Sequence, residues 1–371
     1  MIKPKEFYEL LKENNLEFFT GVPDSLLKDF CAYVNDNATN IITANEGNAI
    51  ALAFGYHLAT GKIGVVYMQN SGLGNATNPL MSLAHPDVYS IPILLIIGWR
   101  GRPGEKDEPQ HIAQGKLTLK MLESLEVKYN ILPENIEDAE EVIEEAVDYM
   151  KNKNSPYALV VKDGTFEEYK GKSVNLNFKL NREDALKLIV PLLDEQDIII
   201  STTGKLSREL FELRESRKEG HNKDFLTVGG MGHASSIALG IALQKSNRNV
   251  YCFDGDGALI MHMGSLATTG MLKPKNFKHI IFNNFTHDSV GGQPTASFFI
   301  NIKDIAKASG YNNIFLAETE DQIKEQFQSL KKSEGPSLLV LNINKGARKD
   351  LGRPTRTPIE NKKDFMNYLK D

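Results

Sequence analysis

The sequence predicts an α/β protein with two doubly wound parallel-sheet domains. Short continuous apolar runs alternate along the chain with longer amphipathic or alanine-rich segments, as buried parallel strands alternate with helices. The two halves of the chain carry this pattern over similar lengths. Between them, residues 163–181 hold few apolar residues at any regular spacing, so we expect a linker there and domains at residues 1–170 and 180–371.

Length and composition agree with two globular domains. A chain of 371 residues is long enough for two separate cores, and 41% hydrophobic with 25% charged residues is typical of globular proteins. The net charge of −5 argues against a nucleic-acid partner, and the longest apolar run, 91–98, is too short for a membrane span. The N-terminus has no apolar core like that of a signal peptide. Cys31 and Cys252 form no disulfide framework, which predicts a cytoplasmic protein.

The elements of the first half follow from apolar periodicity and from the residues that end each run. We expect helices at 4–15, from 26 onward, and at 45–58, 115–126 and 135–152, with strands at 17–20, 41–44, 64–68, 93–97 and 157–161. Asp24 fits the N-cap of the second helix, and Glu46 fits the first turn of the third, where a carboxylate favours the helix dipole. From local sequence alone, these structural roles are the simplest interpretation of both carboxylates.

The second half repeats the pattern. We expect helices at 182–193, from 234 onward, and at 258–272, with strands at 197–201, 249–253, 279–282 and 337–342. Gly264 and Gly270 weaken the third of these helices.

Oxygen ligands end two of these strands. Asp256 follows the strand at 249–253, and Asn284 follows the strand at 279–282. Because ligands bind at the carboxyl ends of parallel strands, the two side chains are expected to converge there and to suit Mg²⁺. Gly255 and Gly257 allow a diphosphate to approach the backbone at a helix N-terminus. The segment at Asp256 or the segment at Asn284, taken alone, is better explained as a turn. Their combination, each at the end of its own strand, favours a site for Mg²⁺ and a diphosphate.

Gly255-Asp256-Gly257 followed by Asn283-Asn284 resembles the motif of thiamine-diphosphate enzymes. The resemblance implies that Asp256, Asn284 and the backbone carbonyl of Thr286 bind Mg²⁺, which holds the cofactor's diphosphate. It covers nearly the whole chain, with a pyrimidine-binding domain first and a diphosphate-binding domain second. It also implies a homodimer or higher oligomer with active sites between subunits. Phe285 departs from the smaller residue expected after the Asn pair.

The same resemblance implies further cofactor contacts. Asn45-Glu46-Gly47-Asn48-Ala49 is similar to the segment whose glutamate hydrogen-bonds the cofactor's pyrimidine, and Asn70 begins a loop similar to the family's Asn-Ser-Gly-x-Gly loop. Gly229 corresponds to the carbonyl that accepts from the cofactor's amino group, and Met231 to the bulky residue that bends the cofactor. The remaining implied contacts are Thr203, Gly204, Gly255, Gly257 and Ala258.

The resemblance implies the non-oxidative decarboxylation of a 2-oxo acid. Glu46 would favour the tautomer that generates the cofactor ylid; the ylid would attack the substrate, CO₂ would leave, and an aldehyde would be released. Asp24, His111 and His287 are candidates for proton transfer and substrate orientation. His111 fits equally well as an ordinary residue at the entry to a helix.

Four further stretches resemble family members whose 2-oxo acid substrate carries a tetrahedral anion. They are 21–25, 107–111, 287–295 and 351–355. The resemblance implies conversion of 3-phosphonopyruvate to phosphonoacetaldehyde and CO₂ in phosphonate biosynthesis, with sulfopyruvate as the alternative substrate. Arginine suits such anions because its planar fork binds two oxygens at once. The candidates are Arg100, Arg102, Arg348, Arg353 and Arg356.

Two other classes of protein are less favoured. A member that binds the cofactor without turnover would not need Glu46 together with Asp256 and Asn284. A nucleotide-binding oxidoreductase would carry Gly-x-Gly-x-x-Gly after a strand, and the sequence has no such segment. Titration with thiamine diphosphate and with NAD distinguishes these classes.

Overall fold

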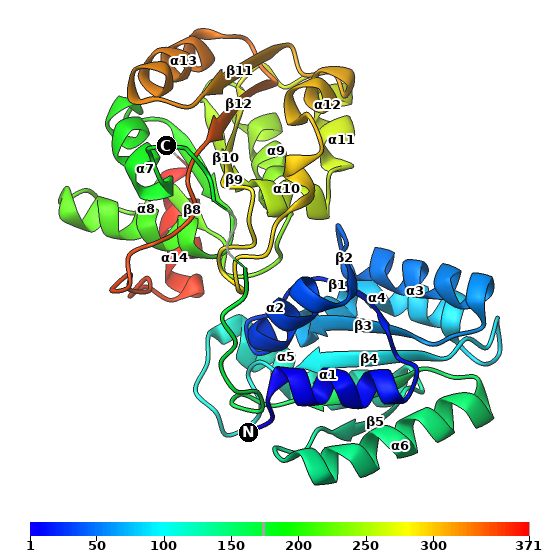
Figure 1. Ribbon diagram of the computed structural model, residues 1–371. Coiled ribbons are helices and arrows are strands. Elements are labelled where there is room, and N and C mark those ends of the chain that lie inside the picture. Colours follow the sequence, from blue (N-terminus) through cyan, green and yellow to red (C-terminus); the bar gives the residue numbers. More distant parts are fainter. Residues whose placement is uncertain (173–174, 371) are drawn as a thin grey trace. The chain divides into compact units, whose positions relative to one another are not determined.

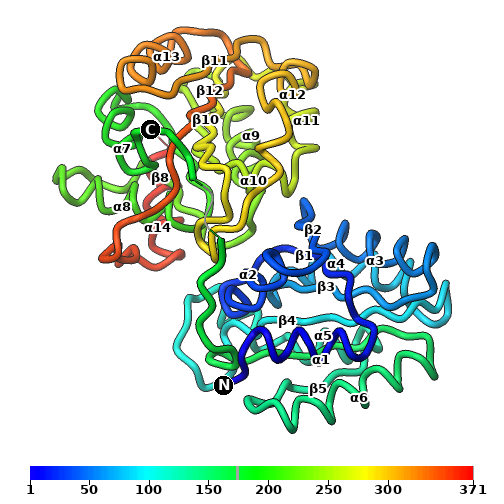
Figure 2. The backbone as a smooth tube through the Cα atoms, in the orientation of Figure 1, coloured from blue at the N-terminus to red at the C-terminus, as the bar shows by residue number. Residues whose placement is uncertain are grey.

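The computed structural model describes residues 1–172 and 175–370. The chain forms two compact units, Met1–Val174 with Val290–Gln293, and Asn175–Ser289 with Pro294–Asp371. Each unit contains a six-stranded parallel sheet with helices on both faces (Figure 1). The predicted α/β class with two doubly wound sheets is confirmed. The colours of Figure 2 follow the backbone from blue to green through the first unit and from green to red through the second.

The sheet of the first unit has the order β2-β1-β3-β4-β6-β5. Its strands are β1 (Phe18–Gly21), β2 (Thr39–Ile42), β3 (Gly64–Gln69), β4 (Ile93–Gly98), β5 (Lys128–Ile131) and β6 (Tyr157–Val161). Its helices are α1 (Pro4–Glu13), α2 (Lys28–Asn37), α3 (Glu46–Thr60), α4 (Leu73–Pro79), α5 (Pro109–Ser124) and α6 (Ile136–Lys153). Alternate residues of the central strands enter two apolar cores, one under α1, α2 and α6 and the other under α3, α4 and α5.

The sheet of the second unit has the order β11-β12-β10-β9-β7-β8. Its strands are β7 (Ile198–Ser201), β8 (Asp224–Leu226), β9 (Val250–Gly255), β10 (Phe277–Asn283), β11 (Asn313–Ala317) and β12 (Ser337–Asn342). Its helices are α7 (Arg182–Ile189), α8 (Lys205–Ser216), α9 (Ala234–Gln244), α10 (Asp256–Met261), α11 (Ser265–Leu272), α12 (Ile302–Ala308), α13 (Glu320–Lys332) and α14 (Pro358–Tyr368). Two cores again lie on opposite faces of the sheet.

The structure corrects three predicted elements or caps. The helix expected at 258–272 is two helices, α10 and α11, because the chain turns between His262 and Gly264. The helix expected at 115–126 already begins at Pro109, so His111 lies in its first turn. Asp24 does not cap α2, which begins at Lys28 with Leu27 as N-cap.

Sequence analysis also missed three strands, β5, β8 and β11. Each lies at or next to an edge of its sheet, where burial is incomplete and the apolar run is short or interrupted.

None of the helices formed by residues 1–172 and 175–370 is both long and apolar enough to pass through a bilayer.

Candidate active site

Asp256 and Asn284 follow two neighbouring strands of the second unit. β9 and β10 run parallel, with Phe282 opposite Gly255, so the two side chains leave the same edge of the sheet. Both are buried, with 2% and 6% of their surface exposed. Burial raises the pKa of Asp256 to about 6, while the hydroxyls of Thr295 and Ser297 and the backbone N–H of Asn284 act to lower it. The site therefore contains a desolvated carboxylate that hydrogen-bond donors help to keep ionised.

Thr295 and Ser297 had not been assigned a role from the sequence. Their hydroxyls donate to the same oxygen of Asp256, Oδ2, at 2.5 and 2.9 Å. The backbone N–H of Thr295 also donates to the carbonyl of Phe285 at 2.9 Å, which closes a loop over residues 286–294. One carboxylate oxygen of Asp256 is thus held by the end of this loop.

The segment after β10 accommodates the large residue that had been unexpected there. Phe285 adopts a left-handed backbone conformation with φ of 60°. Its ring stacks on Phe178, with centroids 5.7 Å apart, and packs against Phe298 at 4.9 Å. The side chain of Asn284 accepts from the backbone N–H of Thr286 at 3.1 Å, and Thr286 is 4% exposed. The ring of Phe285 is thus accommodated between two other aromatic rings.

Three other residues of the second unit that were predicted to belong to the site, Met231, Gly257 and His287, lie close together. A Cβ added to Gly257 would lie 3.3 Å from two ring atoms of His287 and 3.5 Å from Cε of Met231. Burial lowers the pKa of His287 to about 4, so its imidazole is neutral at neutral pH. Ala258 follows in α10 and is buried, and Gly229 is half-buried before α9. Gly257, which has no side chain, therefore leaves a space next to Met231 and His287.

The turn between β7 and α8 lies beside the segment that carries His287. Gly204 has φ of 101°, and its added Cβ would lie 3.3 Å from Oγ of Ser289. Lys205 donates to the carbonyl of Asp288 at 2.8 Å. Arg182 pairs with the carboxylate of Asp288 at 3.3 Å.

Arg182 also makes a two-pronged pair with Glu209, at 2.7 and 2.8 Å. These ion pairs connect the segment after β10 to α7 and to α8, which begins directly after Gly204. They had not been predicted from the sequence.

In the first unit, Glu46 is the first residue of α3 and is 5% exposed. Its Oε2 accepts from the side-chain amide of Asn75 at 2.7 Å. A Cβ added to Gly72 would lie 2.6 Å from Oε1. Asn70, by contrast, donates to the carbonyl of Arg100 at 2.9 Å and to Thr118 at 2.8 Å. Its own buried Oδ1 has no hydrogen-bond partner among the residues that the structure describes. Within the predicted loop, the contacts with Glu46 therefore come from Gly72 and Asn75.

Asp24 lies over the end of β4. A Cβ added to Gly98 would lie 1.9 Å from Asp24 Oδ2, and this oxygen accepts from the backbone N–H of Leu26 at 3.1 Å. Burial raises the pKa of Asp24 to about 6, opposed by the Leu26 N–H and the charge of Arg100. Arg100 donates to Asp107 at 2.8 and 2.6 Å and to Ser25 at 2.6 Å. The structure thus brings Asp24 and Arg100 into one polar cluster.

The other predicted basic residues are dispersed. His111 is half-buried at the start of α5, and Arg102 pairs with Glu105 at 2.8 Å. Arg348 pairs with Glu183 at 2.8 Å and also with Glu212. Arg356 pairs with Asp364, and Arg353 is exposed in the tail after β12.

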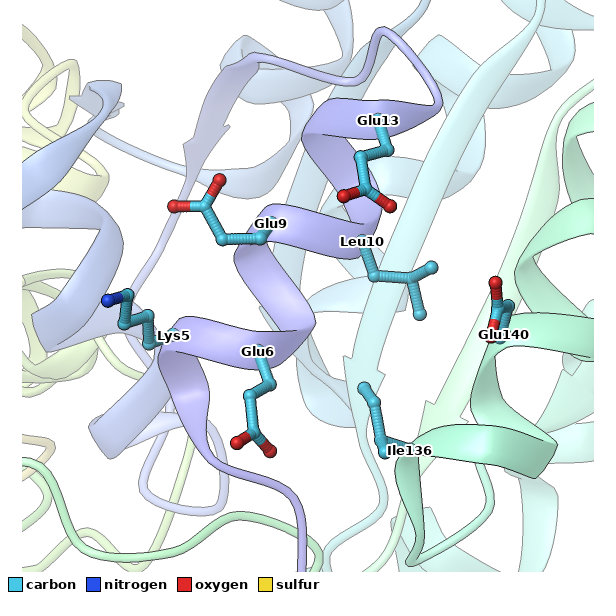
Figure 3. A pocket seen from close by; sticks show the side chains of 7 residues that line it. All are labelled: Lys5, Glu6, Glu9, Leu10, Glu13, Ile136 and Glu140. Carbon is cyan, nitrogen blue, oxygen red and sulfur yellow. The ribbon is translucent and has the colours of Figure 1, made fainter.

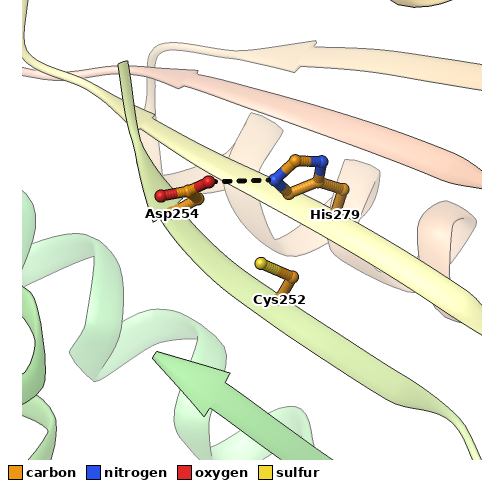
Figure 4. A group of neighbouring side chains, drawn as sticks. All are labelled: Cys252, Asp254 and His279. Carbon is orange, nitrogen blue, oxygen red and sulfur yellow. Dashed lines mark hydrogen bonds and ion pairs between the residues drawn. The ribbon is translucent and has the colours of Figure 1, made fainter. Parts of the chain in front are cut away.

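A second polar group lies inside the sheet behind Asp256. Cys252, Asp254 and His279 are fully buried on one face of β9 and β10 (Figure 4). Asp254 accepts from the backbone N–H of Gly255 at 3.0 Å and lies 3.4 Å from His279 Nε2. His279 Nδ1 lies 3.2 Å from the hydroxyl of Tyr311. Because its polar side chains have partners within the protein, we interpret the group as support for the strand end at Gly255.

A surface groove between α1 and α6 has different chemistry. It has a volume of about 380 Å³ and is lined by Lys5, Glu6, Glu9, Leu10, Glu13, Ile136 and Glu140 (Figure 3). None of the predicted site residues lines it.

Comparison with known proteins identifies the family. Residues 5–122 match the model of the thiamine pyrophosphate enzyme N-terminal TPP binding domain, and residues 202–341 match that of the C-terminal TPP binding domain. The chain belongs to the thiamine pyrophosphate enzyme family. The resemblance expected from the motifs is confirmed, and the two TPP binding domains support thiamine diphosphate, the same compound, as the cofactor.

Full-length relatives are similar to nearly the whole chain. The chain is 35% identical to phosphonopyruvate decarboxylase of Streptomyces viridochromogenes, over 94% of this chain and 90% of the relative. It is 34% identical to phosphonopyruvate decarboxylase of Streptomyces hygroscopicus, over 95% and 90%. It is 27% identical to sulfopyruvate decarboxylase of Methanosarcina acetivorans, over 100% and 98%.

The residues present fit the chemistry of this family's cofactor. The second unit offers hard oxygen donors in Asp256 and Asn284, as a divalent metal on a diphosphate requires. Gly257 leaves a space that a Cβ would fill. The first unit offers a buried carboxylate, Glu46, with Oε2 already hydrogen-bonded.

Proposed function

We propose that this chain is a thiamine-diphosphate-dependent carboxy-lyase that converts 3-phosphonopyruvate and a proton to phosphonoacetaldehyde and CO₂. The observation that carries the proposal is similarity over nearly the full chain to two phosphonopyruvate decarboxylases. The buried carboxylates Glu46 and Asp256, one in each unit, support it.

Mg²⁺ would be held by Asp256, Asn284 and the backbone carbonyl of Thr286. Because both hydroxyls donate to Oδ2 of Asp256, Oδ1 is the oxygen that we assign to the metal. When bound, thiamine diphosphate supplies the carbanion and the electron sink for loss of CO₂. Thr203, Gly204, Gly229, Met231 and the segment 255–258 would contact it in the second unit.

Four side chains of this chain would handle protons and orient the substrate. Glu46 is placed to share a proton through Oε1. Asp24, with a pKa of about 6, would hold or release a proton near neutral pH. His287 is neutral at that pH and would donate or accept a hydrogen bond without a cationic charge. His111 is the fourth candidate for proton transfer or substrate orientation.

Among the five candidate arginines, Arg100 is the one we favour for the phosphonate group. Its side chain is only 19% exposed, whereas those of Arg348 and Arg356 are 38% and 42% exposed. Arg100 also lies in the polar cluster with Asp24. A guanidinium at this position would bind two oxygens of a tetrahedral anion once the substrate competes with Asp107.

Sulfopyruvate is the second candidate substrate, favoured by the similarity to a sulfopyruvate decarboxylase along the whole chain. Both substrates carry a tetrahedral anion, so the same arginines would serve either.

The deciding experiment restores thiamine diphosphate and Mg²⁺ to metal-stripped protein and supplies phosphonopyruvate, sulfopyruvate or pyruvate. Aldehyde and CO₂ are measured for each. The highest kcat/KM is expected for phosphonopyruvate. A higher kcat/KM for sulfopyruvate would assign sulfopyruvate as the substrate and leave decarboxylation as the reaction. No aldehyde from any of them, with cofactor bound, would contradict a decarboxylase.

We also propose a homodimer or higher oligomer with active sites at the subunit interface. Ala51, Gly55 and Leu58 lie on an exposed face of the apolar helix α3, and Leu58 is 65% exposed. In the second unit, Leu243, Met271 and Leu272 are also exposed. Covering such apolar surface favours association of subunits.

The cytoplasmic location predicted from the sequence stays a prediction.

A further inference from the structure

The starts of α3 and α4 approach each other closely around Glu46. A Cβ added to Gly47 would lie 2.9 Å from the backbone carbonyl of Asn75, so this glycine lets α4 come close. Gly72, just before α4, lies against the other side of the Glu46 carboxylate, where a Cβ would be 2.5 Å from Cγ. The Glu46 side chain is therefore held between Gly72 and Asn75, which lie three residues apart at the start of α4.

The two oxygens of this carboxylate have different surroundings. Oε2 accepts from Nδ2 of Asn75 at 2.7 Å, while Oε1 faces the backbone at Gly72. The amide NH₂ end of Asn75 faces the carboxylate and is the donor of this hydrogen bond. Asn75 thus distinguishes one oxygen of Glu46 from the other.

We propose that Asn75 is a positioning residue of the reaction, which occupies Oε2 of Glu46 so that Oε1 is the oxygen presented to the cofactor's pyrimidine. This inference rests on the proposed function. The hydrogen bond from Asn75 restrains rotation of the Glu46 carboxylate. The amide of Asn75 does not titrate, so the proton is shared between Oε1 and the ring alone.

The chemistry of an amide suits this position better than that of other side chains. Leucine has a similar size but no donor, so Oε2 would lose its partner. Aspartate has a similar shape but would bring a second carboxylate to the first, which disfavours the ionised form of both. Asn75 is half-buried, so these changes leave the core of the unit intact.

The test compares the holoenzyme, with thiamine diphosphate and Mg²⁺, in three variants. Asn75→Leu removes the donor, and Asn75→Asp is a second variant of nearly unchanged shape. Asn78→Leu is the matched control, because Asn78 lies in the same helix, is exposed, and accepts a hydrogen bond from Ser82 through its side-chain oxygen. The rate of hydrogen–deuterium exchange at C2 of the bound cofactor is followed by acid quench and NMR, and the cofactor Kd is measured by tryptophan fluorescence.

Both Asn75 variants are expected to exchange roughly tenfold to hundredfold more slowly, the scale of one lost charge-assisted hydrogen bond. The cofactor Kd changes much less, and Asn78→Leu behaves like the wild type.

Exchange at the wild-type rate in folded Asn75→Leu or Asn75→Asp would overturn the proposal. A change in cofactor Kd alone, with normal exchange, would assign Asn75 a merely structural role and overturn it too. If the wild type accelerates exchange no more than free solution does, the proposed function fails first, and the role of Asn75 fails with it.

Discussion

Glu46 and Asp256 are buried carboxylates, each at the first residue of a helix and each in a different unit. In both, one oxygen is hydrogen-bonded by a side chain that lies well away in the sequence, Asn75 for Glu46 and Thr295 for Asp256. The second oxygen is left for a ligand. This shared arrangement lets each carboxylate act through one defined atom.

Replacement of Glu46 by glutamine keeps its shape and removes its charge. We expect cofactor binding to persist and kcat to fall by at least roughly a hundredfold, because general acid–base catalysis is lost. Steady-state kinetics and a cofactor titration measure the two effects. Glu17→Gln, at an exposed position, serves as control. Normal turnover in Glu46→Gln would remove Glu46 from the mechanism.

The raised pKa of Asp256 predicts that cofactor binding depends on pH. A metal ligand must be deprotonated, so Mg²⁺-dependent affinity should be complete above the pKa of about 6 and fall as pH drops through it. Thr295→Val removes a donor that favours the ionised form, so the midpoint should move to higher pH. Isothermal titration of thiamine diphosphate and Mg²⁺ across pH measures it.

The exposed Thr268→Val is the control for Thr295→Val. An affinity in wild type and Thr295→Val that does not change between pH 5 and 8 would exclude Asp256 from the metal site.

At the level of elements, α10 and α11 show two different uses of glycine. Gly264 lies in the turn between them, and a Cβ there would meet no atom within 4 Å. Gly270 lies within α11, and a Cβ there would be 1.6 Å from the carbonyl of Ser309. The first glycine is replaceable, and the second lets α11 approach the turn after α12.

Alanine at these two positions should therefore have different effects on stability. Gly270→Ala should lower the free energy of unfolding by about 1–3 kcal/mol, the usual range for overpacking. Gly264→Ala should leave it unchanged or raise it by up to about 1 kcal/mol, since its backbone is already helical and alanine narrows the unfolded ensemble. Urea unfolding of the two variants measures both. Equal stability would contradict the close approach at Gly270.

On the scale of the whole molecule, the exposed apolar face of α3 predicts association. We expect the wild type to sediment as a dimer or larger species, and Leu58→Lys to shift it toward monomer and to lower decarboxylation with it. Glu140→Lys adds a lysine to an exposed helical position in the groove of Figure 3 and serves as control. A fully active monomer would contradict active sites shared between subunits.

Much of this architecture follows from the sequence alone. The alternation of apolar strands with helices was sufficient for the fold class, because buried parallel strands need continuous apolar runs. Asp256 and Asn284 were predicted as neighbours because the carboxyl ends of parallel strands meet at one edge of a sheet. The role of Glu46 was predicted from the resemblance of its segment, 45–49, to that of thiamine-diphosphate enzymes. The edge strands β5, β8 and β11 were missed because partial exposure shortens or interrupts the apolar run.

Only the tertiary structure decided which side chains hold the predicted ones. Asn75 lies 29 residues from Glu46, and Thr295 lies 39 residues from Asp256, so no local pattern relates them. Asp24 likewise fitted a helix cap by sequence, yet it lies buried over Gly98 at the end of β4. Residue type and strand order determine which groups reach the site. Packing between distant segments determines which oxygen of each carboxylate is left for the chemistry.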